Sequence, residues 1–294
     1  MFKRIINLLL LQYLIRKRSI KRIILFLKTK EKIVVKDFQG IKMFLDLRDG
    51  GISTDLALDG IREPESTRII QQTLKTGDVV VDIGANIGYY ALMEARLVGK
   101  EGVVYGIEPS PKNINLLKKN IKLNNFKNLK TYQIGIGDKK GTAKMYVSPH
   151  SNLNSLVRQK NRKIINTIDI EVRTLDDFLK DKKYPDLIRM DVEGYEYSIF
   201  KGMKKILSDE RQLKLFIELH PHIMKRTQTI YVLRNLMQHG FETSKVIKSI
   251  TVTEMKVMMK KDYDFSSMTI KDLMRDESII NGSKGAFEIF VERK

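Results

Sequence analysis

Apolar runs and helical patterns alternate through the central part of the chain. Residues 79–83 are apolar except for Asp82, and a helical pattern over residues 89–98 follows them after a glycine-rich turn. Further apolar runs have the composition of buried strands, and helical patterns lie between most of them. They occupy residues 103–108, 129–134, 186–191, 213–219, 241–247 and 286–292. The alternation predicts an α/β fold with a mostly parallel, seven-stranded sheet and helices on both faces.

Shorter elements are expected between and around these strands. Residues 65–74 predict a helix closed by Gly77 as its C′ residue, and residues 174–179 predict a short helix capped by Thr174. Residues 148–166 are polar and without periodicity, which is typical of a loop. The remaining strand-like segments are a hairpin and two inserted strands, at residues 32–36, 41–47, 142–147 and 168–172.

The domain division follows from the same patterns. Residues 1–31 predict a basic, apolar, helical extension, and residues 32–294 predict one large domain with a full core. Within that domain, residues 65–247 and the last strand form the expected core. Residues 248–284 carry no readable motif and are interpreted as an insertion that covers a substrate pocket.

The turn after residues 79–83 is the strongest sign of a ligand site. It reads Gly84-Ala85-Asn86-Ile87-Gly88 and leads into a helix, so it offers close backbone approach and unpaired N–H groups. A dinucleotide fingerprint needs a second glycine where Asn86 stands, which weakens a nicotinamide interpretation. Asp82 suits a cationic ligand such as S-adenosylmethionine. Glu108, at the end of the next strand, is expected to accept the ribose hydroxyls, although alone it would be an ordinary exposed acid.

Six sequence blocks resemble one known family in the same order. They are DIGANIGYY, IEPSPKNINLLKKN, IGIGDKKGTAKMYV, TLDDFL, PDLIRMDVEGYEYSIFKGM and LFIELHP. Together they resemble FkbM-type methyltransferases, a Rossmann-like class I branch of the enzymes that use S-adenosylmethionine. The resemblance covers roughly residues 37–241. It implies that Glu63 helps to roof the cofactor, that Asp138 approaches the adenine, and that the 148–166 loop faces the substrate.

Acidic residues gather where two expected strands end. Asp191, Glu193 and Glu196 follow the fourth strand, and three carboxylates so close together are costly unless a cation meets them. Glu218 and His220 end the fifth strand. His220 has the intrinsic pKa of a general base for a hydroxyl acceptor, oriented by Glu218 or Glu193. The alternative is that His220 only caps the following helix.

The acidic residues at the ends of these two strands allow two further interpretations. Asp191, Glu193, Glu218 and His220 are the residue types of an oxygen-rich divalent metal site, but their spacing does not demand one, and no metal is expected. Enzymes that methylate a nucleic-acid amino group carry an Asn/Asp-Pro-Pro-aromatic motif here. This chain has Asp191-Val192-Glu193-Gly194 instead, which removes most support for base methylation.

Charge and composition change the picture at the N-terminus. The chain has 54 basic and 35 acidic residues, a net charge of +19, which favours an anionic partner. Residues 1–36 hold eleven Lys or Arg against Glu31, so +10 of that charge lies there. With two apolar blocks, the segment predicts helices lying on an anionic membrane surface, or a helical prefix packed on protein. The chain has no cysteine and no apolar run long enough to span a bilayer, so we expect a cytoplasmic protein. Attachment to the inner face of the membrane is the alternative that the first interpretation of the segment implies.

The sequence is compatible with three functions. An O-methyltransferase acting on a sugar, glycolipid or other small metabolite follows from the resemblance. An RNA methyltransferase would suit the net charge, but the sequence has no recognisable RNA-binding signature. The third is a membrane-associated protein that kept the cofactor fold without catalysis. The oligomeric state does not follow from the sequence.

Overall fold

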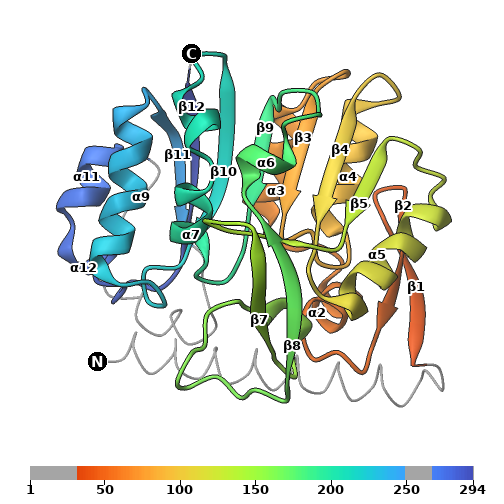
Figure 1. Cartoon of the computed structure of the whole chain (residues 1–294). Coiled ribbons are helices and arrows are strands. Elements are labelled where there is room, and N and C mark those ends of the chain that lie inside the picture. The colour runs from red at the N-terminus through yellow and green to blue at the C-terminus, as the bar shows by residue number, and fades with distance from the viewer. Residues whose placement is uncertain (1–31, 249–266, 294) are drawn as a thin grey trace, which may run out of the picture.

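A seven-stranded sheet forms the centre of the computed structural model (Figure 1). The strand order is β11-β12-β10-β9-β3-β4-β5. All neighbours are parallel except β12, which runs antiparallel to β10 and β11. The predicted mostly parallel sheet is therefore confirmed. The strands are β3 (Val79–Ile83), β4 (Val103–Ile107), β5 (Leu129–Tyr132), β9 (Leu187–Met190), β10 (Leu213–Leu219), β11 (Glu242–Lys248) and β12 (Phe287–Arg293).

The structure describes residues 32–248 and 267–293. The predicted extension at residues 1–31 and residues 249–266 of the 248–284 segment lie outside these ranges. Among the described residues, no helix has the length and apolar character needed to cross a bilayer.

The sheet order determines where a ligand can bind. The next two strands of this sheet along the chain, β4 and β5, lie on one side of β3. The later parallel strands, β9 and β10, lie on its other side. The order reverses between β3 and β9. In open α/β sheets, the crevice outside the carboxyl ends of the strands at such a reversal is the usual ligand site.

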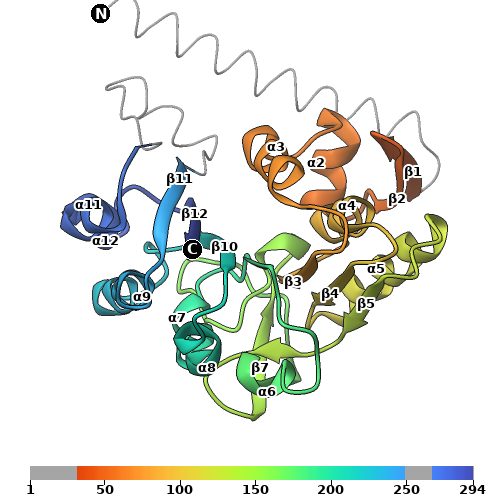
Figure 2. The ribbon, with the colours of Figure 1, turned by 90° about the horizontal axis from the view of Figure 1, so that it is seen from above.

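Two helical layers cover the sheet, as Figure 2 shows from above. Alternate residues of β3 point to opposite layers: Val80 packs in one core, and Val79, Val81 and Ile83 pack in the other. Burial on both faces explains the nearly continuous apolar run. One layer contains β1 (Ile33–Phe38), β2 (Ile41–Asp46), α2 (Ile52–Asp59), α3 (Pro64–Thr73), α4 (Tyr89–Val98) and α5 (Pro111–Leu123). The other contains α6 (Leu175–Phe178), α7 (Glu196–Lys201), α8 (Lys204–Ser208), α9 (Arg226–Gln238), α11 (Ile270–Arg275) and α12 (Glu277–Ile280).

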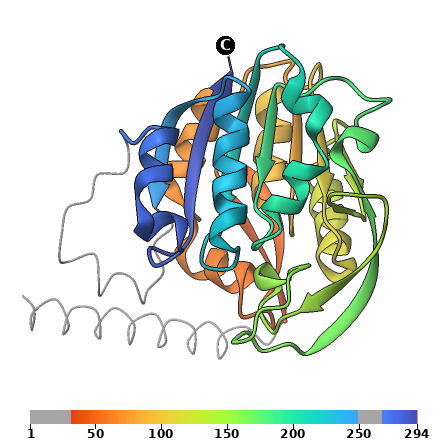
Figure 3. The same cartoon turned by 60° about the vertical axis from the view of Figure 1, so that its left-hand side comes forward.

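A second sheet holds the polar 148–166 loop. It consists of β6 (Gly135–Ile136), β8 (Asn166–Arg173) and β7 (Gly141–Val147), and Figures 1 and 3 show β7 and β8 reaching beyond the central strands. Several contacts fasten the loop. Ser155 bridges to Tyr146, and the backbone N–H and hydroxyl of Ser151 donate to the carboxylate of Asp49 at 2.9 and 2.5 Å. The loop is thus held against the main domain.

Local predictions succeeded where a side chain supplies the cap and failed where it does not. Thr174 caps α6 as expected, accepting the Asp177 N–H at 3.1 Å. Helix α3 instead ends at Thr73 with extended Leu74 as its cap, so Gly77 is not its C′ residue. Helix α2 was not predicted.

Candidate active site

A cavity opens at the carboxyl ends of β3, β4 and β9, at the point where the strand order reverses. Its walls include Gly84, Ala85 and Asn86 from the glycine turn, and Glu108 after β4. Asp191 and Glu193, beyond β9, form another side, and the 151–156 segment of the loop closes it. No residue of the described 267–284 segment lines this cavity. Helices α11 and α12 pack against α9. That residues 248–284 cover a substrate pocket stays a prediction.

The glycine turn has the backbone conformation that its sequence suggested. Gly84 has φ of 90°, and a Cβ there would collide with the carbonyl oxygen of Asp191. Only glycine therefore lets the two strand ends approach so closely. Asn86 takes the left-handed conformation at φ 51°, which asparagine tolerates better than most residues. Gly88 lies outside the cavity lining, where it begins α4 at φ 99° and lets Leu117 pack closely.

Glu108 lies directly beneath this turn. Its carboxylate accepts the backbone N–H of Asn86 at 2.9 Å and that of Ser110 at 2.8 Å. The side chain is almost fully buried, and burial outweighs these hydrogen bonds to raise the pKa of Glu108 to about 7. The predicted meeting of the glycine turn and Glu108 is present; the ribose role of Glu108 remains a prediction.

Asp82 does not face the cavity, contrary to its expected role beside a cationic ligand. It is fully buried, and its Oδ1 lies 3.0 Å from Nη1 of Arg189, its direct neighbour on β9. Burial raises the pKa of Asp82, and the Arg189 guanidinium opposes that rise. Arg189 lines the cavity and also stacks on Tyr90, with 4.0 Å between its Cζ and the ring centroid. The cation paired with Asp82 is therefore part of the protein.

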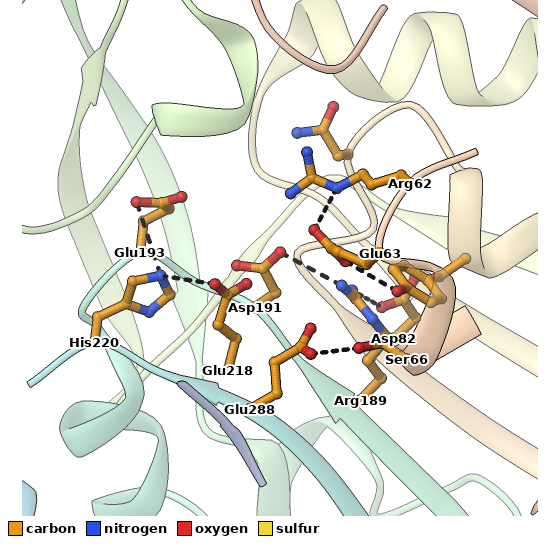
Figure 4. Close-up of polar contacts among 12 residues, drawn as sticks. Arg62, Glu63, Ser66, Asp82, Arg189, Asp191, Glu193, Glu218, His220 and Glu288 are labelled. Carbon is orange, nitrogen blue, oxygen red and sulfur yellow. Dashed lines mark hydrogen bonds and ion pairs between the residues drawn. The ribbon is translucent and has the colours of Figure 1, made fainter. Parts of the chain in front are cut away.

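Glu63 is also one residue removed from the cavity. It has a left-handed backbone, φ 44°, and its carboxylate binds Nε of Arg62 at 2.6 Å and the hydroxyl of Tyr90 at 2.9 Å. Arg62 and Tyr90 line the cavity, whereas Glu63 does not. Figure 4 shows this arrangement. Glu63 therefore positions two wall residues rather than forming the wall itself.

Asp138 lies away from the position implied for it. Its carboxylate pairs with Nζ of Lys201 at 3.2 Å, and it is not among the residues that line the cavity. The neighbouring wall is made by Ile134, Gly135 and Ile136, with Tyr195 beside them. An apolar wall of this kind suits a flat aromatic ring better than a carboxylate does.

His220 is buried at the end of β10. The carboxylate that holds it belongs to Glu196, which was not predicted to be its partner. The imidazole Nδ1 lies 2.7 Å from Oε1 of Glu196, which also accepts the Gly194 N–H at 3.0 Å. The expected partners are farther away: Nε2 lies 3.8 Å from Glu218 and 4.0 Å from Glu193. Glu196 therefore orients the ring. Helix α9 begins at Arg226 with Lys225 as its N-cap, so His220 does not cap it.

The electrostatics of this cluster count against His220 as a general base. Burial by itself lowers the pKa of the imidazole, but the surrounding carboxylates, first that of Glu196, hold the pKa well above its ordinary value. Burial, with Asp191 nearby, also raises the pKa of Glu218 well above its usual range. A raised pKa favours the protonated imidazole, whereas a general base has to be unprotonated. The base role remains a hypothesis.

Glu288 was not predicted and belongs to the same edge. It stands opposite Glu218 in the β10–β12 pair, and the hydroxyl of Ser66 donates to it. Burial, with Glu63 nearby, raises the pKa of Glu288 to about 8. Its position next to the site depends on the antiparallel strand and has no local sequence signal.

Comparisons with known proteins identify one family. A family model described as "Methyltransferase FkbM domain" matches residues 82–243. The chain is 27% identical over 162 residues to "Methyltransferase sdnD" of Sordaria araneosa, covering 44% of this chain and 62% of that protein. It is 27% identical over 174 residues to "2-O-methyltransferase NoeI" of Sinorhizobium fredii, covering 52% of this chain and 70% of that protein.

Among solved structures, the chain is similar to a methyltransferase FkbM from Methylobacillus flagellatus. The sequence identity is 22% and the TM-score 0.37, and the match covers 56% of this chain and 41% of that one. The present chain thus spans less than two thirds of both sdnD and this structure.

Proposed function

Because the chain belongs to the FkbM methyltransferase family, we propose that it transfers a methyl group from S-adenosylmethionine to a hydroxyl of a sugar, glycolipid or other small metabolite. The observation that carries this proposal is the junction of the Gly84 turn with buried Glu108 at the edge of the cavity. The relative named as a 2-O-methyltransferase supports a hydroxyl acceptor.

The residues around the cavity suit the parts of this cofactor. Glu108 has acceptor oxygens for two ribose hydroxyls, the Ile134–Ile136 wall suits adenine, and the carboxylate of Asp191 suits the amino group. When bound, the cofactor supplies an activated methyl group for in-line displacement. The protein has to align the acceptor oxygen with it and take up a hydroxyl proton.

Two measurements test the proposal. Calorimetry should detect binding of S-adenosylmethionine that weakens at least about tenfold in Glu108→Ala, since both ribose contacts are lost. Glu277→Gln is the matched control, because Glu277 is exposed and pairs with Arg226. Methyl-tritiated cofactor should then label a glycan or lipid-linked sugar in an acceptor panel that includes RNA. Absence of cofactor binding would overturn the proposal that the protein is a methyltransferase. Labelling of RNA alone would overturn the proposed class of acceptor.

A further inference from the structure

We propose that Asp191, Glu193 and His220 bind one divalent cation at the edge of the cavity, and that this cation contacts the acceptor. Each side chain offers one ligand atom, and the three atoms lie within 4.8 Å of one another. Figure 4 shows the three side chains converging from the ends of β9 and β10. The cation site stands on these side chains alone, and only its use on the acceptor rests on the proposed function.

The spacing suits a single ion. Carboxylate and imidazole ligands lie about 2.0–2.2 Å from a first-row divalent cation, so two ligands on opposite sides of it are separated by about 4.0–4.4 Å. Nε2 of His220 and Oε2 of Glu193 are 4.0 Å apart. Oε1 of Glu218 is 3.8 Å from the same nitrogen.

His220 supplies evidence independent of the acidic cluster. Its side chain is only 4% exposed, and its hydrogen bond is made by Nδ1 to Glu196. Nε2 is thereby aimed at Glu193 and Glu218, both beyond hydrogen-bonding distance. Histidines that bind metals commonly donate their second nitrogen to a carboxylate, which fixes the ring. The Glu196–His220 pair has this form.

Carboxylates are the commonest side chains around His220. Four carboxylates surround the imidazole: Asp191, Glu193, Glu196 and Glu218. Two arginines offset them in part. Arg162 pairs with Glu193 at 3.0 Å, and Arg189 lies 3.4 Å from Asp191 but is shared with Asp82. The carboxylates thus outnumber the two arginines and the imidazole.

The ligand types indicate the class of metal. One imidazole with two carboxylates suits Mn²⁺, Fe²⁺ or Zn²⁺ better than Ca²⁺, which prefers oxygen ligands alone. Asp191 and Glu193 line the cavity, so a cation between them faces any bound molecule. A cation in that position orients an acceptor hydroxyl and lowers its pKa.

Manganese binding can be measured without cofactor or acceptor. The full chain, cleared of metal with a chelator, is titrated with Mn²⁺, and the free ion is followed by electron paramagnetic resonance. We expect one tightly bound ion per chain. His220→Ala and Glu193→Gln should weaken binding at least about tenfold, and Glu196→Gln about 10- to 100-fold through misorientation of the ring. Asp169→Asn, at an exposed pair with Lys144, is the control and should bind as the wild type does.

The outcomes separate this site from the proposed function. If His220→Ala does not fold, as judged by circular dichroism, Glu193→Gln still decides, since that side chain is partly exposed. Absence of Mn²⁺ binding, or equal binding by wild type and Glu193→Gln, would overturn the cation site. Binding of S-adenosylmethionine without Mn²⁺ would leave the proposed function standing. Binding of Mn²⁺ without the cofactor would leave only the cation site.

Discussion

Arg189 on β9 and Asp82 on β3 are direct neighbours across the sheet, and their buried side chains form a 3.0 Å ion pair. The guanidinium also lies at the cavity wall and on the ring of Tyr90. Asp82 is therefore coupled to the ligand site through Arg189 rather than through contact with a ligand.

Removal of Asp82 should act first on stability. Asp82→Ala leaves the Arg189 charge buried and partly unpaired, so we expect the free energy of unfolding to fall by about 3–5 kcal/mol. The double change Asp82→Leu with Arg189→Met removes both charges and should recover most of that loss. Denaturant unfolding of both variants measures the difference. A fully stable Asp82→Ala protein that no longer binds S-adenosylmethionine would show instead that Asp82 contacts the ligand.

Gly84 should tolerate no side chain. Gly84→Ala places a Cβ against the Asp191 carbonyl and forces alanine to φ near 90°, so it should weaken cofactor binding at least about tenfold. Gly77→Ala separates the two causes, because Gly77 has φ of 94° but open space around its Cβ position. That control should lose only about 1–2 kcal/mol of stability and keep its affinity. Similar affinity loss in both variants would exclude the close approach as the cause.

The pKa of Glu108 makes two pH effects testable. The folded value of about 7 lies above the ordinary 4.5, so the folded chain holds more protons than the unfolded chain between these values. Ionisation of Glu108 therefore lowers the free energy of unfolding as pH rises from 4.5 to 7, and Glu108→Gln should remove that slope. Unfolding of both proteins across this range checks the sign.

Cofactor affinity should change in the opposite direction. An ionised Glu108 accepts both ribose hydroxyls, so wild type should bind S-adenosylmethionine about tenfold more weakly at pH 6 than at pH 8. The amino group of the ligand titrates in the same pH range. Its effect is the same for both proteins, so the comparison with Glu108→Gln isolates the contribution of the Glu108 side chain to the pH dependence. Parallel pH profiles for the two proteins would show that Glu108 does not contact the ribose.

The basic N-terminal segment predicts attachment to anionic lipid. Full-length protein should float with vesicles containing phosphatidylserine and not with neutral vesicles, because residues 1–36 carry +10 of the net charge together with two apolar blocks. Deletion of residues 1–31 should abolish flotation and leave cofactor affinity unchanged. Equal flotation of the deleted protein would locate lipid binding elsewhere.

The sequence predicted the elements well because the information is local. An apolar run followed by Gly84 defines β3 and its turn, and Thr174 defines the start of α6. The side-chain partners were harder, because sheet register decides them. Asp82 and Arg189 are 107 residues apart in sequence. A charged residue within the apolar run at Arg189 was nevertheless a usable signal, since a buried charge requires a partner.

The sequence also did not show which carboxylate hydrogen-bonds to the imidazole of His220. Glu193, Glu196 and Glu218 were all near the expected edge, but Glu193 takes a left-handed backbone at φ 52° and Gly194 follows at φ 98°. This turn brings Glu196, rather than Glu193, under the Nδ1 atom. Backbone conformation at two residues thus decided which carboxylate orients the imidazole.

The placement of β12 between β10 and β11 has a consequence for synthesis. A growing chain on the ribosome that has completed β10 still has one side of that strand exposed, and β11 cannot join the sheet until β12 has emerged. Glu288 also arrives only then. The nascent protein therefore passes through a long interval with an open strand edge, which is the kind of surface that chaperones shield from aggregation.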